Sequence, residues 1–501
     1  MFRTIQINKY IFDRCIDLAY ILLDKNKLNL AATFSKDIAY FAANNITGYY
    51  SSWRLERLLF LISKKTNFKS GNVFDTLIFN DKEVVNLEIL HVVTQVYKTG
   101  GHTKLLKNWI DIDTINNHSV VSTSMEFGDL KRVMSFHELS EVKKYYLTGT
   151  LINKSVQLRT LASKFDKIIL HIHQYDVIPN LSFSDFKHKK NIIFLNHADH
   201  IFWLGVSIFN VLAQIRENNI ELDILRRGVN NCQLYLPIPL KDLEIKNKSS
   251  KVIFKKELNL SEDSIVLLSV ASAYKFKPID NKNYFSDIIE ILNLNKKLIL
   301  FVIGVKGNEN FTIKHPQIKY LGVVRNIEKY ELIADVYIEN YPLASFTSML
   351  QFMKKQIPVH LMYEPNDSIR FFSKDNEQFK YSKNKLEWKK RLLNLIKNKN
   401  EIRKKIIVNQ NNYLKQNNSS AAWLVRLNII YEAKDEVNIF KKNLFFNSEE
   451  EFFLSNYMSK KNKFSFKPLL FSLNFIEFFK FIKLFYYLSI LKVESKKKKV
   501  L

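Results

Sequence analysis

Histidine and aspartate side chains gather around two apolar runs of this 501-residue chain. The runs DKIILHIH (166–173) and NIIFLNH (191–197) contain or precede six of them: His171, His173, Asp176, His197, Asp199 and His200. A carboxylate beside an imidazole can orient a general base or help to bind a metal ion. The carboxyl ends of parallel strands form a ligand crevice, so we expect at least one of these side chains to be functional.

A pair of glycines lies between a strand-like run and a helix-like run earlier in the chain. The run 86–96 is followed by TGGHT (99–103), which contains Gly100, Gly101 and His102. Glycines let the backbone approach a ligand closely, and the following helix offers free N–H groups to an anion or a polar sugar. The spacing fits neither the dinucleotide fingerprint nor the P-loop. A simple tight turn is the alternative, but the place at the first strand-to-helix switch favours a ligand site.

A third group of polar residues lies in the second half of the chain. In SVASAYKFKP (269–278), Lys275 follows a strand-like run at a position suited to binding phosphate. Farther on, ADVYIENYPLASFTSMLQFMKK (334–355) places four polar side chains around the start of a helix-like run: Glu339, Ser345, Thr347 and Ser348. Hydroxyls and free N–H groups at a helix start can bind an anion. Ordinary capping of the helix is the alternative.

The runs between these groups predict the elements that position them. Residues 1–82 have apolar side chains at helical spacing and form a predicted helical extension. In 83–245, and again in 246–435, short apolar runs alternate with longer amphipathic ones. This alternation predicts two consecutive α/β domains, each with a doubly wound parallel sheet. Residues 436–501 form a basic tail rich in aromatic side chains.

The segment 474–492 of this tail is expected to be an amphipathic helix. Its polar residues recur every three positions, and a run of four lysines follows it, Lys496 to Lys499. A wide apolar face with lysines at its edge is typical of a helix that lies in a membrane interface. The alternative is that this helix packs on the protein and that the lysine run is a solvated end.

The charge balance is strongly basic, with 76 Lys and Arg residues against 49 Asp and Glu. The net charge of +27 favours acidic partners such as anionic lipid, nucleic acid or phosphorylated substrates, and a Lys-rich background composition is the competing explanation. Cys15 and Cys232 are the only cysteines, which excludes a disulfide framework and a cysteine zinc site and favours a reducing cytoplasm. No secretory signal and no membrane-spanning helix are expected.

Together, these motifs resemble those of GT-B glycosyltransferases, of the kind found in glycosyltransferase family 4 and in O-linked N-acetylglucosamine transferases. TGGHT looks like the glycine turn after the first strand of that superfamily, and SVASAYK looks like the strand and basic residue that contact a diphosphate. ENYPLASFTSMLQFMKKQIPV (339–359) is similar to the superfamily's late signature. The resemblance covers about residues 85–435 and implies two Rossmann-like domains that face each other across a cleft.

The sequence also departs from the superfamily pattern. Gln351 stands where many members have a ribose-binding glutamate, and Gln356 stands where many have glycine. The arginine that precedes the lysine in the group resembling glycogen synthase is absent from SVASAYKFKP. Whether the anomeric configuration is retained or inverted therefore stays open.

The resemblance implies transfer of a sugar from a nucleotide-diphosphate donor, with UDP the most frequent nucleotide in the superfamily. The implied donor-binding residues are Gly100, Gly101, Lys275, Glu339, Ser345, Thr347, Ser348 and Gln351. Lys275, Thr347 and Ser348 would stabilise charge on the departing diphosphate. Gln351 would bind ribose hydroxyls, and Glu339 a hydroxyl of the sugar or the ribose.

On the acceptor side, the resemblance implies that His102, His173 and His200 bind or deprotonate the acceptor, with Asp199 as the orienting carboxylate. No bound metal is required for this reaction. The acceptor would be a glycan, a lipid-linked sugar or a protein, in bacterial surface glycan or glycoprotein synthesis. The basic tail would hold the enzyme on the inner face of the cell membrane.

Two other classes of protein stay open from the residues alone. A metal-dependent hydrolase would use the His and Asp residues of 171–200, although their spacing matches no zinc motif such as HExxH. A basic nucleic-acid-binding protein would fit the net charge. Its lysines, however, are scattered rather than gathered with aromatic residues on one module, so no nucleic acid partner is expected.

Overall fold

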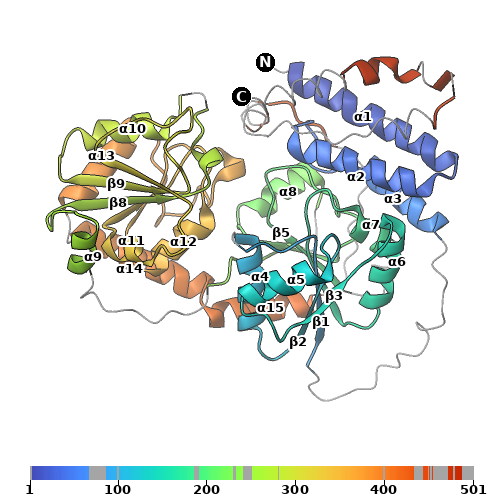
Figure 1. Cartoon of the computed structure of the whole chain (residues 1–501), viewed down its shortest axis with the longest axis horizontal. Coiled ribbons are helices and arrows are strands. Elements are labelled where there is room, and N and C mark those ends of the chain that lie inside the picture. The colour runs from blue at the N-terminus through green and yellow to red at the C-terminus, as the bar shows by residue number, and fades with distance from the viewer. Residues whose placement is uncertain are drawn as a thin grey trace. The chain divides into compact units, whose positions relative to one another are not determined.

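The computed structural model divides the chain into two compact units, which are described separately (Figure 1). The first comprises Met1–Leu236 with Leu424–Leu501, and the second comprises Pro237–Trp423. The described residues are 3–66, 86–98, 101–184, 191–229, 233–240, 251–279, 281–398, 401–433, 444–448, 451, 454, 472–474, 476–477 and 480–487.

The first unit begins with an all-helical segment, as the apolar spacing predicts. Described residues 3–66 contain the helices α1 (Arg3–Asp24), α2 (Leu28–Asn44) and α3 (Trp53–Lys65). The Ser52 hydroxyl starts α3 by accepting a hydrogen bond from the Leu55 N–H at 3.3 Å. The apolar faces of the three helices form one core with α7 (Val177–Phe183), so the segment is part of the first unit and not a separate domain.

The sheet of the first unit, in the described residues, has seven parallel strands in the order β3-β2-β1-β4-β5-β6-β7. The strands are β1 (Glu88–Val93), β2 (Asn117–Ser122), β3 (Lys143–Tyr146), β4 (Lys167–His171), β5 (Asn191–Asn196), β6 (Val211–Gln214) and β7 (Gln233–Tyr235). The further helices of this unit are α4 (Gly101–Ile112), α5 (Phe127–Phe136), α6 (Leu151–Ala162) and α8 (Asn219–Arg227). Leu90 and Val92 of β1 pack with α6 and α7, whereas Val93 packs with α4 and α5. Both faces of the sheet are therefore covered, which explains why the central strands read as apolar runs.

The second unit, where it is described, has five parallel strands in the order β10-β9-β8-β11-β12. These strands are β8 (Ile265–Val270), β9 (Leu298–Ile303), β10 (Ile318–Gly322), β11 (Val336–Ile338) and β12 (Val359–His360). Its helices are α9 (Lys251–Glu257), α10 (Tyr284–Leu292), α11 (Glu328–Ile333), α12 (Phe346–Lys354), α13 (Lys385–Lys397) and α14 (Glu401–Asn417). Buried Ile288 of α10 and Trp388 of α13 share one apolar core with the strands. The predicted α/β class with two Rossmann-like domains is therefore confirmed.

The chain returns to the first unit within α15 (Ser420–Glu432). The Tyr431 hydroxyl accepts a hydrogen bond from Trp109 Nε1 at 3.1 Å and donates one to Asp113 Oδ2 at 2.9 Å. The sequence-based range 246–435 assigns these residues to the second domain. The apolar spacing of a helix shows that it is half-buried, but it does not show which sheet the helix covers.

The described part of the basic tail packs on the N-terminal helices. Residues 480–487 are helical, and Phe481 and Leu484 are buried in the core that α1, α2 and α3 form. Arg14 of α1 donates a hydrogen bond to the Lys480 carbonyl at 2.9 Å. This side of the predicted amphipathic helix therefore contacts protein. In the described residues no helix has both the length and the apolar character that crossing a bilayer requires.

Candidate functional site

The glycine turn leads directly into α4. Gly101 is the first residue of that helix, whereas Gly100 lies outside the described residues. The buried Thr103 hydroxyl accepts a hydrogen bond from the Tyr97 N–H at 2.8 Å and so joins the loop after β1 to the start of α4. His102 consequently lies in the first turn of the helix, at the carboxyl edge of the sheet.

Three histidines from different segments meet at this edge. The ring centroid of His102 lies 4.8 Å from that of His197 and 6.3 Å from that of His173. The two ring nitrogens of His173 are each 3.1 Å from a phenol oxygen, Nε2 from Tyr97 and Nδ1 from Tyr175. The structure thus brings the predicted residues His102 and His173 together, and His197, another residue of the predicted strand-end group, lies with them. These three residues are termed the histidine cluster below.

Burial keeps the histidine cluster neutral. It lowers the pKa of His102 and His173, and it lowers the pKa of His197 to about 4. A neutral imidazole has one lone pair, with which the ring can accept a hydrogen bond from a hydroxyl. Burial also raises the pKa of Tyr175 to about 12, which keeps its phenol protonated at neutral pH. The cluster can therefore accept hydrogen bonds from a hydroxyl-bearing ligand.

Asp199 contacts the predicted partner His200, but most of its contacts stabilise the fold. Its Oδ1 lies 3.3 Å from His200 Nδ1, and its Oδ2 lies 2.7 Å from Arg216 Nη2 and accepts a hydrogen bond from Asn219. Burial alone would raise the pKa of Asp199, yet the Arg216 guanidinium and the bonds from His200 and Asn219 hold it well below its usual range. Asp199 is therefore ionised and belongs to a buried ion pair.

Asp176, another residue of the predicted group, connects strand ends. Its Oδ2 accepts hydrogen bonds from the hydroxyls of Thr94 at 2.7 Å and Thr123 at 2.5 Å, and its Oδ1 caps α7 through the Ile178 N–H at 3.1 Å. Within the part of the chain that the structure describes, no three His, Cys, Asp or Glu side chains are close enough to hold a metal ion. The hydrolase alternative therefore gains no support from these contacts.

In the second unit, Lys275 lies beside the start of α12. It belongs to the 3-10 turn η3 (Ala273–Phe276), which follows β8. Its Nζ donates a hydrogen bond to the Ala344 carbonyl at 2.9 Å and lies 3.4 Å from Ser345 Oγ. Burial lowers the pKa of Lys275 to about 8, so the ammonium form still dominates at neutral pH. The structure thus joins the two sequence motifs of this unit at one place.

The hydroxyl residues of α12 lie in its first turn. Ser345 is the N-cap residue, but its side chain makes no capping hydrogen bond. Thr347 and Ser348 follow, and in the described structure no hydrogen bond connects either hydroxyl to another residue. One turn farther on, Gln351 donates a hydrogen bond to Glu331 at 2.6 Å. The first turn of α12 therefore combines a nearby ammonium group, hydroxyls and the N–H groups of a helix start.

Glu339 lies directly after β11 and is completely buried. Its Oε2 accepts a hydrogen bond from the Met362 N–H at 2.9 Å, and its Oε1 has no hydrogen-bond partner in the described structure. Burial raises the pKa of Glu339 to about 7. A carboxyl group of this kind can be both a donor and an acceptor near neutral pH.

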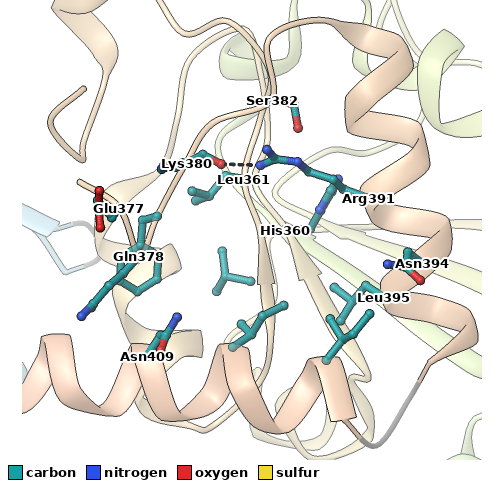
Figure 2. Close-up of a pocket in the computed structure, with 14 residues that line it drawn as sticks. His360, Leu361, Glu377, Gln378, Lys380, Ser382, Arg391, Asn394, Leu395 and Asn409 are labelled. Atoms are coloured by element: carbon teal, nitrogen blue, oxygen red, sulfur yellow. Dashed lines mark hydrogen bonds between the residues drawn. The ribbon is translucent and has the colours of Figure 1, made fainter. Parts of the chain in front are cut away.

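A cavity of about 300 Å³ lies elsewhere in the second unit, beside β12 (Figure 2). The strand, the helices α13 and α14, and the segment 377–382 line it. Arg391 lies at this cavity and donates a hydrogen bond to the Lys380 carbonyl at 2.7 Å, as the dashed line shows. The predicted donor-binding residues of this unit are not among its lining residues. The cavity is therefore separate from the group around Lys275.

Sequence reasoning missed two buried histidines of the first unit, His91 and His118. They lie on β1 and β2, and their rings are joined by a hydrogen bond of 2.9 Å between His91 Nε2 and His118 Nδ1. The sequence feature that could have indicated them is a histidine inside, or at the start of, an otherwise apolar strand run. Such a ring needs a buried polar partner, and this partner comes from a strand far away in the sequence.

The candidate residues lie where Rossmann-like domains bind their ligands. Two parallel sheets, each covered by helices, carry their candidate residues after the carboxyl ends of the strands, which is where Rossmann-like domains bind ligands. One domain offers neutral imidazoles at this edge, and the other offers an ammonium group beside a helix start.

Comparisons with known proteins identify the fold. No protein-family model and no curated protein matches the chain. The glycosyltransferase of Rickettsia africae ESF-5 is similar with a TM-score of 0.54 at 10% identity, over 70% of this chain and 98% of that chain. Anabaena HepE (Alr3699), solved in complex with UDP and glucose, is similar with a TM-score of 0.51 at 10% identity, over 70% of this chain and 100% of that chain. At such low identity the likeness shows the fold alone, and this is the two-domain GT-B fold that the motifs resemble.

Proposed function

We propose that this protein is a glycosyltransferase that moves a sugar from a nucleotide-diphosphate sugar, a UDP-sugar, to an acceptor hydroxyl or amide. The observation that carries the proposal is the contact of Lys275 with the loop that starts α12. A departing diphosphate develops negative charge, and donors that are fixed in advance stabilise it. The UDP and glucose bound by the Anabaena protein of the same fold support the choice of nucleotide.

The donor would be bound by the second unit. The Lys275 ammonium group would pair with the diphosphate, and Ser345, Thr347 and Ser348 would donate hydroxyl hydrogen bonds beside the N–H groups of the helix start. Gln351, one turn along the same helix, would bind the ribose. Glu339 would bind a hydroxyl of the sugar or the ribose through its unpaired oxygen.

The acceptor would be bound by the first unit. As the bond between the sugar and the diphosphate breaks, the acceptor oxygen bonds to the sugar carbon and its proton passes to a neutral imidazole of the histidine cluster. The electron pair of the broken bond stays with the diphosphate. His102, His173 and His200 would bind or deprotonate the acceptor, with Asp199, 3.3 Å from His200, as the orienting carboxylate. Gly100 and Gly101 would let the donor approach the backbone closely.

A thermal-shift screen tests this proposal, because a ligand that binds only the folded protein raises its melting temperature. We expect UDP and UDP-sugars to raise the Tm, and GDP and CMP to raise it less. Lys275→Met should abolish the shift while the Tm of the free protein changes little. Lys277→Met is the matched control, since Lys277 is exposed and lies two residues farther along. Equal shifts in both variants would contradict the proposed diphosphate site.

The acceptor class and the membrane association are also proposals. The described tail helix exposes 51% of Ile482 and 63% of Tyr486, close to Lys480 and Lys483. Apolar side chains beside lysines favour an anionic bilayer, where lipid-linked and surface glycan acceptors would be found. Replacing Lys480 and Lys483 by Glu should reduce co-sedimentation with vesicles that contain anionic lipid. Unchanged binding would remove this part of the proposal and would leave the transfer reaction in place.

A further inference from the structure

A chain of three hydrogen-bonded histidines crosses the interior of the first unit. His91 on β1 lies between His118 on β2 and His171 on β4. Its Nε2 is 2.9 Å from His118 Nδ1, and its Nδ1 is 3.0 Å from His171 Nε2. At the far end, His118 Nε2 is 2.9 Å from the main-chain carbonyl oxygen of Asp113. These three residues, termed the histidine chain, are not used in the reaction proposed above.

The histidine chain runs diagonally across three adjacent strands toward the histidine cluster. In the parallel register Ile89 pairs with His118 and Val93 pairs with His171, so each step moves two residues along β1. Two residues of a strand span about 6.6 Å. The chain therefore begins near the amino end of β2 and ends at the carboxyl end of β4. There the His171 ring lies 6.3 Å from that of His102, measured between centroids.

The positions of the hydrogens follow from one end of the histidine chain. A carbonyl oxygen only accepts hydrogen bonds, so His118 must carry its hydrogen on Nε2. In the neutral form of His118 this is its single N–H, so His118 Nδ1 accepts, and His91 donates to it from Nε2. The Nδ1 of His91 then has no hydrogen and accepts from His171 Nε2. His171 therefore keeps an acceptor at Nδ1. The Asp113 carboxylate, 3.4 Å from His118 Nε2, favours the same assignment, and it accepts a further hydrogen bond from Tyr431.

Burial keeps the rings of His91 and His171 neutral. Burial lowers the pKa of His91 far below its usual range and lowers that of His171 to about 3. The other titratable rings near His171 belong to the histidine cluster, and burial keeps these neutral as well. His91 and His171 therefore each keep one donor nitrogen and one acceptor nitrogen.

The last ring of the histidine chain faces a ring whose nitrogens are unpaired. In the described structure His171 Nδ1 and both ring nitrogens of His102 are buried and lack a hydrogen-bond partner of good geometry. The main-chain carbonyl of His171 also faces the His102 ring. With its Nε2–H donated to His91, the His171 side chain keeps only an acceptor, Nδ1, and the main-chain carbonyl is a second acceptor. The tautomer of His102 that suits them has its N–H toward His171 and its lone pair away from it.

We propose that the histidine chain sets the tautomer of His102, so that a lone pair rather than a hydrogen faces the acceptor substrate. His118, His91 and His171 are positioning residues in this scheme, because they act through His102 and do not touch the substrate. This inference rests on the proposed function, because it takes His102 as the base that receives the proton of the acceptor. In the transfer step the acceptor O–H bond breaks and its proton binds the His102 lone pair. The resulting imidazolium then donates its other N–H to His171.

Substitutions at His118 separate this role from simple packing. His118→Gln keeps an oxygen that can accept from His91 and an amide that can donate to the Asp113 carbonyl, so the tautomers stay as they are. His118→Leu removes both groups. With UDP-glucose as donor and release of UDP as the readout, we expect kcat to fall about 10- to 100-fold in His118→Leu with KM unchanged, and less than about threefold in His118→Gln. Equal losses in the two variants would overturn the proposal, since only a proton-conducting or a purely structural role predicts them.

Nitrogen NMR on the full chain labelled with ¹⁵N-histidine tests the hydrogen positions without any substrate. We expect His118, His91 and His171 to carry hydrogen on Nε2 at pH 8, and His91 and His171 to stay neutral down to pH 5. His118→Gln should preserve the pattern at His171, and His118→Leu should disturb it. Hydrogen on Nδ1 of His91 or His171 would overturn the proposal. If the tautomers are as expected but no UDP-sugar binds, the proposed function fails and the hydrogen assignment stands. If transfer occurs and the tautomers differ, only this inference fails.

Discussion

The two units share one architecture but differ in the charge of the groups at the carboxyl edge of the sheet. In the first, the carboxyl edge of the sheet carries three neutral imidazoles of the histidine cluster. In the second, the corresponding edge carries the ammonium group of Lys275 beside the start of α12. The strand ends fix where polar groups gather, whereas the side chains fix whether the edge is neutral or cationic. One edge therefore suits a neutral hydroxyl ligand, and the other suits an anion.

The buried carboxylates of the two units differ in the same way. Asp199 in the first unit is ionised because it pairs with Arg216. Glu339 in the second unit has no cationic partner in the described structure, and its pKa is raised to about 7. The first arrangement is a source of stability at neutral pH, and the second is a cost that the surrounding packing must offset.

The largest expected effect is the loss of unfolding free energy when the ion pair of the first unit is removed. Asp199→Ala removes the carboxylate that faces the buried Arg216 guanidinium, and such a loss costs about 3–5 kcal/mol of unfolding free energy. The folded pKa of Asp199 is depressed, so its contribution is present above the unfolded pKa and is lost as pH falls through the folded pKa. Urea unfolding at pH 7 measures it. Asp335→Ala, which removes the less buried pairs with Lys251 and Arg403 in the second unit, should cost less; an equal or larger cost would contradict the comparison.

The next largest effect on stability is expected at Glu339, where stability depends on pH in the opposite direction. Its folded pKa of about 7 lies above the usual 4.5, so the folded protein loses stability as pH rises from about 4.5 to 7. Glu339→Gln cannot ionise and should be more stable than the natural protein at pH 8 by up to about 3 kcal/mol, with no difference near pH 4. Unfolding curves at the two pH values, with exposed Glu377→Gln as the control, measure this. A gain that does not depend on pH would show that ionisation is not its cause.

The smallest expected effect concerns the binding of UDP by the second unit. Because the pKa of Lys275 is about 8, its positive charge is lost between pH 7 and pH 9. The affinity for UDP should fall by up to about tenfold over this range. Lys275→Arg stays charged and should show a flatter profile. Titration calorimetry with UDP measures both, and parallel profiles for the two proteins would assign the pH dependence to another group.

The order of the elements was predictable because it depends on local pattern. Apolar runs that alternate with amphipathic ones require parallel strands joined by helices, and both sheets confirm this. Lys275 and the start of α12 could also be linked from the sequence, since their motifs follow strands that prove to be neighbours in the sheet, β8 and β11. The same reasoning placed His102 and His173 at one edge.

Other features depended on contacts that no local pattern contains. Asp199 was predicted to orient a histidine, and the sequence offered no reason to pair it with Arg216. The histidine chain joins three strands whose order in the sheet, β2-β1-β4, differs from their order in the chain. The unit on which α15 packs was equally hidden, because the spacing of its apolar side chains does not show which sheet they cover.

The amino-acid sequence by itself therefore determined the kinds of elements, their succession and the strand ends at which polar side chains gather, since these follow from the spacing of apolar residues along a few turns or strands. Only the tertiary structure decided which polar groups are buried together. A buried ring or carboxylate takes its charge and its hydrogens from its neighbours, and these neighbours come from distant parts of the chain.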